Sequence, residues 1–217
     1  MSTHLLRGHD RFQTDYAIRE RQYLKGLAAG QSPSALYISC SDSRVVPELL
    51  TGSRPGDLFV VRNVANVVPR ADEPGTKSVG ASVEFAVNVL KVPHIVVCGH
   101  YGCGGINAAL EGLDKLEGMS CLQEWLTRVE PAALKAKAAG IAADELLGYA
   151  IEENVLDQML NLMTYPCVRE GVEAGTLDIH AWVYDFTGGL VVYDAPSRNF
   201  VSYKSQLERD SARDVAG

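Results

Sequence analysis

The segment from Ile95 to Gly105 constrains the fold more than any other part of the chain. Four apolar residues, Ile95-Val-Val-Cys98, run directly into the glycine-rich turn Gly99-His-Tyr-Gly-Cys-Gly-Gly105, and a helical pattern begins near Ile106. A short, continuous apolar strand is typical of the middle of a parallel sheet, where both faces are buried. Parallel sheets bind their ligands at the carboxyl ends of the strands, so the polar residues of this turn become candidate site residues.

Two further strands and a hairpin complete the expected sheet. Ala35–Cys40 and Asp57–Val61 are short apolar segments, and Leu177–Tyr184 and Leu190–Tyr193 flank the turn Thr187-Gly188-Gly189. Helices are expected at residues 45–50, 78–90, 120–139 and 141–164 and from about residue 106. This order predicts an α/β fold with a mainly parallel central sheet, an antiparallel edge and helices on both faces.

The N-terminal residues differ from the rest because they are polar, with spaced apolar positions and good helix formers. We expect residues 1–30 to form a helical arm and residues 31–217 to form the α/β core of a single domain. The sequence shows no linker, internal repeat or low-complexity segment that would divide the chain further.

Charge and hydropathy argue against several classes of partner. The chain of 217 residues has a formal net charge of −7 and no run of lysine and arginine, so we expect no nucleic acid and no anionic membrane as partner. Its apolar stretches fall far short of the ~20 residues that a membrane span needs. Because the N-terminus also lacks the pattern of a secretory signal, we expect a cytoplasmic protein.

Three cysteine and histidine residues form a candidate zinc site. The chain has five cysteines, an odd number, and no pattern of a secretory signal. Both observations favour reduced thiols or metal ligands over disulfides. Cys40 ends the first expected strand, and His100 and Cys103 follow the third. Cysteine and histidine are ligands that Zn²⁺ prefers, and three protein ligands leave a fourth position open for water. We therefore expect these side chains to bind a catalytic zinc ion at one edge of the sheet.

Asp42 and Arg44 follow the first candidate ligand at intervals of two residues. The Asp42 carboxylate can accept a hydrogen bond from water on the metal, but it can also bind the metal itself. Arg44 offers a bidentate partner that would hold the carboxylate away from the metal. Alone, the two residues would be interpreted as a surface ion pair; beside Cys40, we predict that they are catalytic.

Three motifs together resemble the β-class carbonic anhydrases. They are Cys40-Ser-Asp-Ser-Arg44, Arg62-Asn-Val-Ala-Asn66 and Cys98-Gly-His-Tyr-Gly-Cys-Gly-Gly105. The resemblance implies a zinc enzyme that hydrates carbon dioxide to bicarbonate, with the three ligands and the Asp–Arg dyad named above. It also implies a homodimer or larger oligomer that exchanges helices and pocket walls between subunits.

The resemblance further assigns an apolar substrate pocket. The matching residues are Gln31, Phe59, Val64 and Phe85, and Phe85 stands where the family often has a tyrosine. Phenylalanine lacks the hydroxyl group but keeps the apolar wall that carbon dioxide needs, so we expect the reaction to be unchanged.

Some members of that family carry a second, inhibitory bicarbonate site. Arg62 and Tyr184 match two of its residues, whereas Tyr37 stands in place of its tryptophan. Bicarbonate inhibition through this site is therefore left open.

Other functions also remain open from the sequence. Carbonyl sulfide and carbon disulfide are linear and apolar as well, so a hydrolase of either could use the same ligands. A non-catalytic zinc-binding or bicarbonate-sensing protein would keep the cysteines without needing Asp42 and Arg44. The Gly99–Gly105 turn could bind phosphate at a helix N-terminus, although it lacks the lysine of a P-loop.

Overall fold

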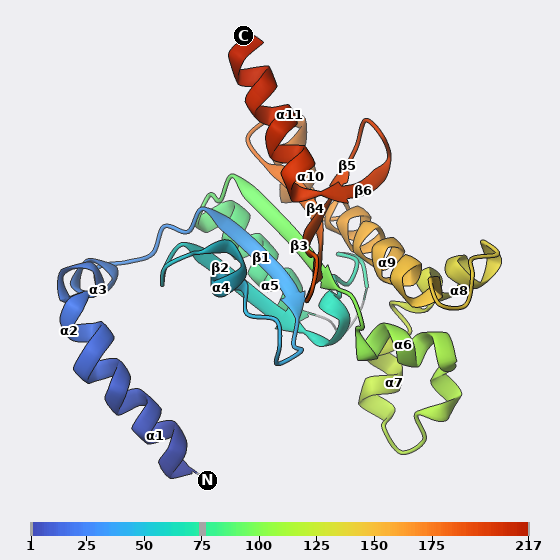
Figure 1. The fold of residues 1–217 in the computed structure, drawn as a ribbon, viewed down its shortest axis with the longest axis horizontal. Coiled ribbons are helices and arrows are strands. Elements are labelled where there is room, and N and C mark those ends of the chain that lie inside the picture. Colours follow the sequence, from blue (N-terminus) through green and yellow to red (C-terminus); the bar gives the residue numbers. More distant parts are fainter. Residues whose placement is uncertain (1, 74–76, 217) are drawn as a thin grey trace. The chain divides into compact units, whose positions relative to one another are not determined.

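The structure is a computed structural model that describes residues 2–73 and 77–216, and it divides into two compact units, 1–32 and 33–217. The first unit consists of helices (Figure 1). They are α1 (Ser2–Arg11), a π-helical turn (Phe12–Tyr16), α2 (Ala17–Arg19) and α3 (Arg21–Leu27). The helices expected in the N-terminal segment are therefore present.

The second unit is built on a six-stranded sheet with the order β2-β1-β3-β4-β5-β6. The strands are β1 (Ala35–Cys40), β2 (Leu58–Asn63), β3 (His94–His100), β4 (Asp178–Asp185), β5 (Gly189–Asp194) and β6 (Asn199–Ser202). Strands β1 to β4 pair in parallel, whereas β5 and β6 add an antiparallel edge. The predicted α/β fold with a mainly parallel sheet is confirmed.

The helices of this unit follow the predicted order with some differences. They are α4 (Pro47–Thr51), α5 (Lys77–Glu84) with a π-helical turn (Phe85–Val89), α6 (Gly104–Glu111), α7 (Ser120–Leu126), α8 (Glu130–Ala138), α9 (Leu146–Leu162), α10 (Pro166–Glu173) and α11 (Tyr203–Ala216). The single helix expected over 120–139 is two helices, because Pro131 begins a new helix and disfavours a continuous one. The described helices include none with the length and hydropathy to cross a membrane.

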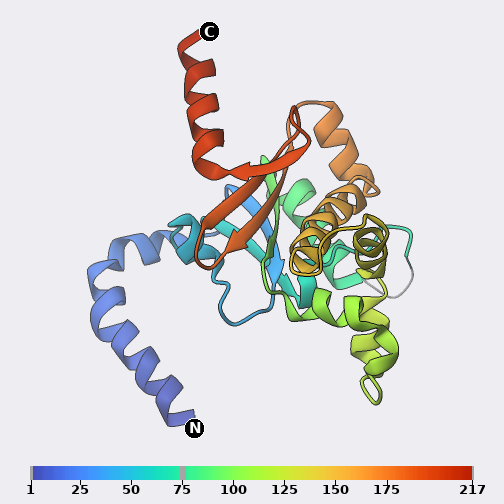
Figure 2. The same ribbon diagram turned by 45° about the vertical axis from the view of Figure 1, so that its right-hand side comes forward.

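One face of the sheet carries the main hydrophobic core. Buried residues of α5, α6, α8, α9 and α10 pack there against β1 residues such as Leu36 and Ile38, and α9 runs along β3 and β4 (Figure 2). The other face carries a smaller cluster around Tyr37, Val96 and Cys98. Among the described residues this cluster contains strand residues alone, and Tyr203 and Leu207 of α11 line a pocket with its neighbours Trp182 and Leu190. Alternate residues of a strand point to opposite faces, and both sets are apolar here, as expected for a sheet that is covered on both faces.

Gly99 allows β3 and α9 to pack closely. A Cβ atom at Gly99 would lie 2.7 Å from Cγ2 of Val155 and 3.5 Å from Cγ2 of Ile151, and both of these residues belong to α9. Close-packed interiors leave no room for such a contact. Because Gly99 directly precedes His100, this packing fixes the position of His100 at the carboxyl end of β3.

Candidate metal centre

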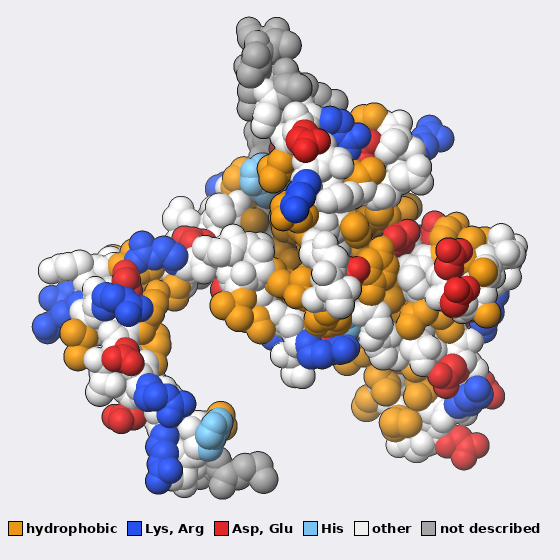
Figure 3. Space-filling model, viewed as in Figure 1, with side chains coloured by type: hydrophobic (Ala, Val, Ile, Leu, Met, Phe, Trp, Pro, Cys, Tyr) orange, Lys and Arg blue, Asp and Glu red, His pale blue; other side chains and the backbone are white. Residues whose placement is uncertain are grey.

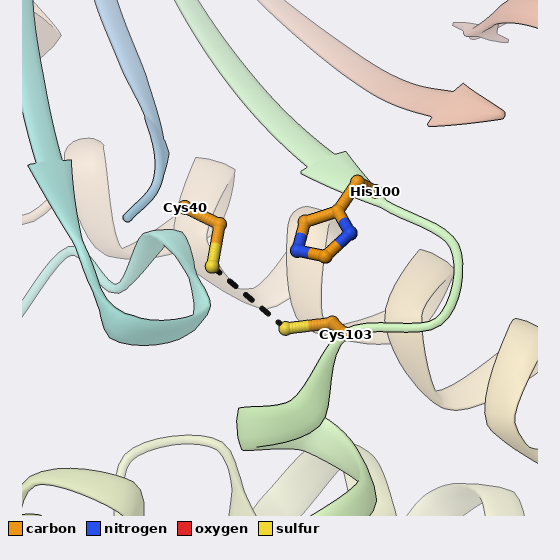
Figure 4. A group of neighbouring side chains, drawn as sticks. All are labelled: Cys40, His100 and Cys103. Atoms are coloured by element: carbon orange, nitrogen blue, oxygen red, sulfur yellow. Dashed lines mark hydrogen bonds between the residues drawn. The ribbon is translucent and has the colours of Figure 1, made fainter. Parts of the chain in front are cut away.

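Cys40, His100 and Cys103 come together at the carboxyl ends of β1 and β3 (Figure 4). The two sulfur atoms are 4.0 Å apart, and the ligand atoms of all three residues lie within 4.8 Å of one another. All three side chains are buried. Gly102 has a φ of 68°, a conformation that suits glycine, and it lies in the short turn that brings Cys103 back toward His100.

The donor set fits a tetrahedral zinc ion. Nδ1 of His100 lies 3.0 Å from the carbonyl oxygen of Tyr101, so Nδ1 carries the proton and donates it, and Nε2 keeps a lone pair. Nε2 is buried without a hydrogen-bond partner, which is a costly state for a polar atom unless a ligand pairs with it. Two Zn–S bonds at the tetrahedral angle would separate the sulfur atoms by roughly 3.8 Å. In residues 2–73 and 77–216, no other trio of such side chains gathers its ligand atoms this closely.

The surroundings of Cys40 stabilise a negative charge on its sulfur. The hydrogen bond with Cys103 is the largest cause, and His100 and the backbone N–H groups of Asp42 and Ala65 add to it, so the pKa of Cys40 is held below its usual range despite burial. The same contact raises the pKa of Cys103, because a second negative charge beside the first is unfavourable. The pair therefore offers one thiolate readily, and it needs a cation to ionise the second.

Asp42 lies beside the cluster and is held by Arg44. The Nε and Nη2 groups of Arg44 donate to Oδ1 and Oδ2 of Asp42 at 2.9 and 2.8 Å, and the backbone N–H of Arg44 donates to Oδ1 at 3.0 Å. These bonds hold the pKa of Asp42 well below its usual range. Oδ2 also lies 3.7 Å from Nε2 of His100. The carboxylate thus reaches the cluster while the guanidinium occupies both of its oxygens.

The loop after β2 has an unusual backbone next to the cysteines. Ala65 and Asn66 have φ values of 63° and 49°, in the left-handed region that residues other than glycine rarely adopt. On α9, Nδ2 of Asn154 donates to the carbonyl of Ala65 at 3.1 Å, and Oε1 of Gln158 accepts from the N–H of Val68 at 2.8 Å. Nε2 of Gln158 donates to Oδ1 of Asn154 at 3.0 Å, which links the two buried amides.

Three more side chains at the end of α9 and just beyond it hold the same loop. Asn161 donates to the carbonyl of Val68 at 3.0 Å, Thr164 accepts from the N–H of Ala71 at 2.9 Å, and the Tyr165 hydroxyl donates to the carbonyl of Pro69 at 2.8 Å. We call the five side chains the loop anchor; they are those of Asn154, Gln158, Asn161, Thr164 and Tyr165. Asn154 bonds the strained residue Ala65 itself, whose N–H supports Cys40, and the other four hold the loop that follows it.

Comparison with known proteins identifies the family. A family model described as carbonic anhydrase matches residues 35–191. A carbonic anhydrase from Pseudomonas aeruginosa is 43% identical over 216 residues, which cover 98% of this chain and 96% of that protein. This chain belongs to the carbonic anhydrase family. A carbonic anhydrase from Synechocystis is 34% identical over 206 residues, covering 94% of this chain and 75% of that one.

Solved structures place this carbonic anhydrase in the β class. The β-carbonic anhydrase CcaA superposes with a TM-score of 0.88 at 34% identity and covers 93% of this chain and 91% of that one. A tetrameric β-carbonic anhydrase from Sordaria macrospora superposes with a TM-score of 0.77 at 30% identity, covering 92% and 98%. Zinc is the cofactor of this family, in agreement with the expectation from the donor set.

Two residues beside the carbonic anhydrase metal centre have contacts that the sequence did not predict. Phe186, in the turn between β4 and β5, lies under the guanidinium of Arg44 at 4.4 Å from the ring centroid and packs edge-on against His100 at 5.7 Å. Arg62 donates to the backbone carbonyls of Cys40 and Asp42 at 3.1 and 2.7 Å. An aromatic residue in a hairpin turn carries no sequence signal for such a position, and the bicarbonate-site role of Arg62 stays a prediction.

Val64 is the one predicted pocket residue that lies in the loop beside the cysteines. It begins the 3₁₀ turn Val64–Asn66, its side chain is 38% exposed, and its carbonyl accepts a hydrogen bond from Nε1 of Trp125 at 2.9 Å. An exposed valine next to a buried metal cluster suits the apolar wall of a pocket.

The other predicted pocket residues lie elsewhere in the chain. The rings of Phe59 and Phe85 pack together with centroids 5.8 Å apart. Phe59 pairs with Leu36, four residues before Cys40, so this aromatic pair lies about 13 Å along the strands from Cys40. Gln31 belongs to the separately described unit 1–32. The pocket assignment of these three residues therefore stays a prediction.

Proposed function

We propose that this β-carbonic anhydrase catalyses the reversible hydration of carbon dioxide to bicarbonate and a proton. The observation that carries the proposal is the buried trio Cys40, His100 and Cys103, with an unpaired Nε2, in a chain of this family. These three residues would hold Zn²⁺, which when bound supplies a Lewis acid that makes water a nucleophile near neutral pH.

Asp42 is proposed to orient the attacking water. Its lowered pKa keeps it ionised, so it can only accept hydrogen bonds. Arg44 holds the carboxylate through a bidentate pair and restrains it from the Nε2 atom of His100, 3.7 Å away. Phe186 in turn lies against the Arg44 guanidinium and limits its movement. Positioning of this kind accelerates a reaction because water enters in a productive orientation.

A second copy of the chain is proposed to complete the pocket. Phe59 and Phe85 lie too far along the sheet to line the metal centre of their own chain, yet Phe85 is 41% and Val89 is 61% exposed. Figure 3 shows hydrophobic side chains over the central part of the second unit. Large exposed apolar groups indicate an interface, and relatives from Sordaria macrospora are tetrameric. We expect the protein to sediment as a dimer or tetramer.

We also propose that arm and core work as one cytoplasmic domain with no nucleic acid partner. The net charge of −7 supports this proposal. Subcellular fractionation of the producing cell tests the location, and recovery in the membrane fraction would contradict it.

Stopped-flow hydration of carbon dioxide by the zinc-loaded protein tests the reaction, from mildly acidic to mildly alkaline pH. We expect rapid hydration that is lost in Cys40→Ser and retained in the control Cys121→Ser, which removes an exposed thiol away from the cluster. Absence of hydration with one zinc ion bound per chain would overturn the proposal. Faster turnover of carbonyl sulfide or carbon disulfide in the same assay would reassign the substrate.

A further inference from the structure

Two histidines outside the metal centre face each other across neighbouring strands. His94 is the first residue of β3 and pairs with Asp178, the first residue of β4; His180 lies two residues further along β4. Because residues two apart in a strand point to the same face, all three side chains lie on one face of the sheet. This face is the one that carries the cluster of Val96 and Cys98.

The separation of the two imidazoles suits a shared metal ion. Nε2 of His180 lies 3.4 Å from Nδ1 of His94, and the ring centroids are 5.2 Å apart. Two nitrogen ligands of a tetrahedral ion are roughly 3.4 Å apart, since each metal–nitrogen bond is about 2.0–2.1 Å. The same distance is long for a hydrogen bond, which for an N–H donor is usually about 2.7–3.2 Å. The nitrogens therefore have the spacing of metal ligands more than that of a strong hydrogen bond.

Asp178 supplies a third, charged donor. Its Oδ2 lies 3.7 Å from Nδ1 of His94, and its side chain is 74% exposed, so it can rotate toward an ion between the rings. His180 is half-buried against Trp182, and burial together with the nearby His94 lowers its pKa. A neutral imidazole is the form that binds metals. Two imidazoles and one carboxylate favour Zn²⁺, Cu²⁺ or Ni²⁺ over Mg²⁺ or Ca²⁺.

We propose that His94, His180 and Asp178 form a second binding site for a divalent transition-metal ion. The site is separate from the catalytic cluster, because His94 and His100 lie at opposite ends of the seven-residue strand β3, about 20 Å apart. An ion bound there links β3 to β4. Because such an ion binds the folded chain and not the separated strands, it raises the thermal stability of the protein.

Zinc titration of the protein whose catalytic site is already filled tests the proposal. Equilibrium dialysis is expected to show a second zinc ion per chain, with a rise in Tm. The imidazole ¹⁵N signals of His94 and His180 are expected to shift during this second step, while those of His4 and His9 stay unchanged. Each of the variants His94→Gln and His180→Gln should weaken the second step at least about tenfold, and Asp178→Asn should weaken it less.

A double variant, His4→Gln with His9→Gln, is the matched control, because it removes two of the five histidines without touching β3 or β4. We expect it to bind the second ion like the parent protein. The proposal is wrong if the second zinc ion binds no more tightly than about 1 mM, or if both single histidine variants bind it unchanged. His94 is 45% exposed, so its replacement is not expected to impair folding and the binding result remains interpretable.

Discussion

Strand β3 carries a histidine at each end, and the two ends of the sheet support these residues very differently. His100 is fully buried between two cysteines, and the nearby loop is fixed by the loop anchor. His94 is 45% exposed and faces one histidine and one exposed carboxylate. The comparison teaches that ligand type alone does not set metal affinity; surroundings that hold the donor atoms in place before binding contribute as much. The carboxyl end should therefore bind zinc far more tightly.

The strongest test of this comparison replaces the histidine at each end in turn. We expect His100→Asn to lose more than about 100-fold in zinc affinity, because a direct ligand contributes more than the supporting residues do, and to lose hydration activity. His94→Asn should keep one tightly bound zinc ion per chain. Zinc content after dialysis against a chelator measures both. Equal zinc retention by the two variants would show that the two ends of the sheet do not differ in zinc affinity.

Arg44→Ala tests how Asp42 is held at the carboxyl end of the sheet. Without the guanidinium, Oδ2 of Asp42 loses its partner and Oδ1 keeps only the backbone N–H of residue 44, so the carboxylate can close on the position that Nε2 of His100 faces. Turnover should fall by roughly 100-fold, the size of a lost positioned acid–base group, while zinc content stays near one per chain.

Arg44→Lys is the matched control for that variant. It keeps the charge but not the bidentate geometry, so an intermediate turnover is expected. Normal turnover in Arg44→Ala would show that Asp42 does not need the arginine.

Removal of one member of the loop anchor has a smaller expected effect. Asn154→Ala deletes the buried bond to the Ala65 carbonyl and should lower the free energy of unfolding by about 1–3 kcal/mol. It should also weaken zinc binding about tenfold, because the N–H of Ala65 supports the Cys40 thiolate. Urea unfolding and competitive chelation measure the two quantities.

Asn161→Ala provides the comparison within the loop anchor. Its bond goes to the carbonyl of Val68, further from the cysteines, so we expect lower stability with unchanged zinc affinity. If Asn154→Ala binds zinc as tightly as the parent protein does, the anchor does not act on the metal centre.

The smallest expected effect concerns pH. Burial raises the pKa of Tyr165 to about 12, above the usual value of about 10. Between these values the folded chain keeps a proton that the unfolded chain has lost, so stability falls as pH rises, by at most about 1.4 kcal/mol per pH unit.

Tyr165→Phe isolates this contribution. The variant should lose about 1 kcal/mol at neutral pH with its bond to the carbonyl of Pro69, but its stability should fall less steeply in alkaline solution. Parallel stability curves for the two proteins, from about pH 9 to about pH 12, would contradict the assignment.

The sequence predicted the carboxyl end of the sheet well because its information is local. Apolar strands ending in Cys40 and His100 specify both the sheet and the place where the ligands meet. The loop anchor was not predicted, because its bond from Asn154 to Ala65 spans 89 residues, and buried amides on a helix resemble solvent-facing ones. A clue existed in the spacing of residues 154, 158 and 161, which follows one face of α9.

The pair of histidines at the amino end of β3 and β4 could not be predicted for a different reason. His94 and His180 come together only because β3 and β4 pair in one register across 86 residues of chain. A shift of one residue would send His180 to the opposite face. The elements β6, α10 and α11 were also missed, since β6 has four residues and α10 has eight, which are short windows for a periodic pattern, and α11 is mostly polar.

Gly99 has a consequence for how this protein can change over generations. A methyl group there would meet Val155 at 2.7 Å, and Asn66 Oδ1 lies 3.7 Å from the same point. If alanine replaces Gly99, either a smaller residue must replace Val155 or α9 must move away from β3. The second change would also move Asn154 away from Ala65. Positions 99 and 155 are thus expected to be inherited as a pair, with a small residue at one compensating for a larger residue at the other.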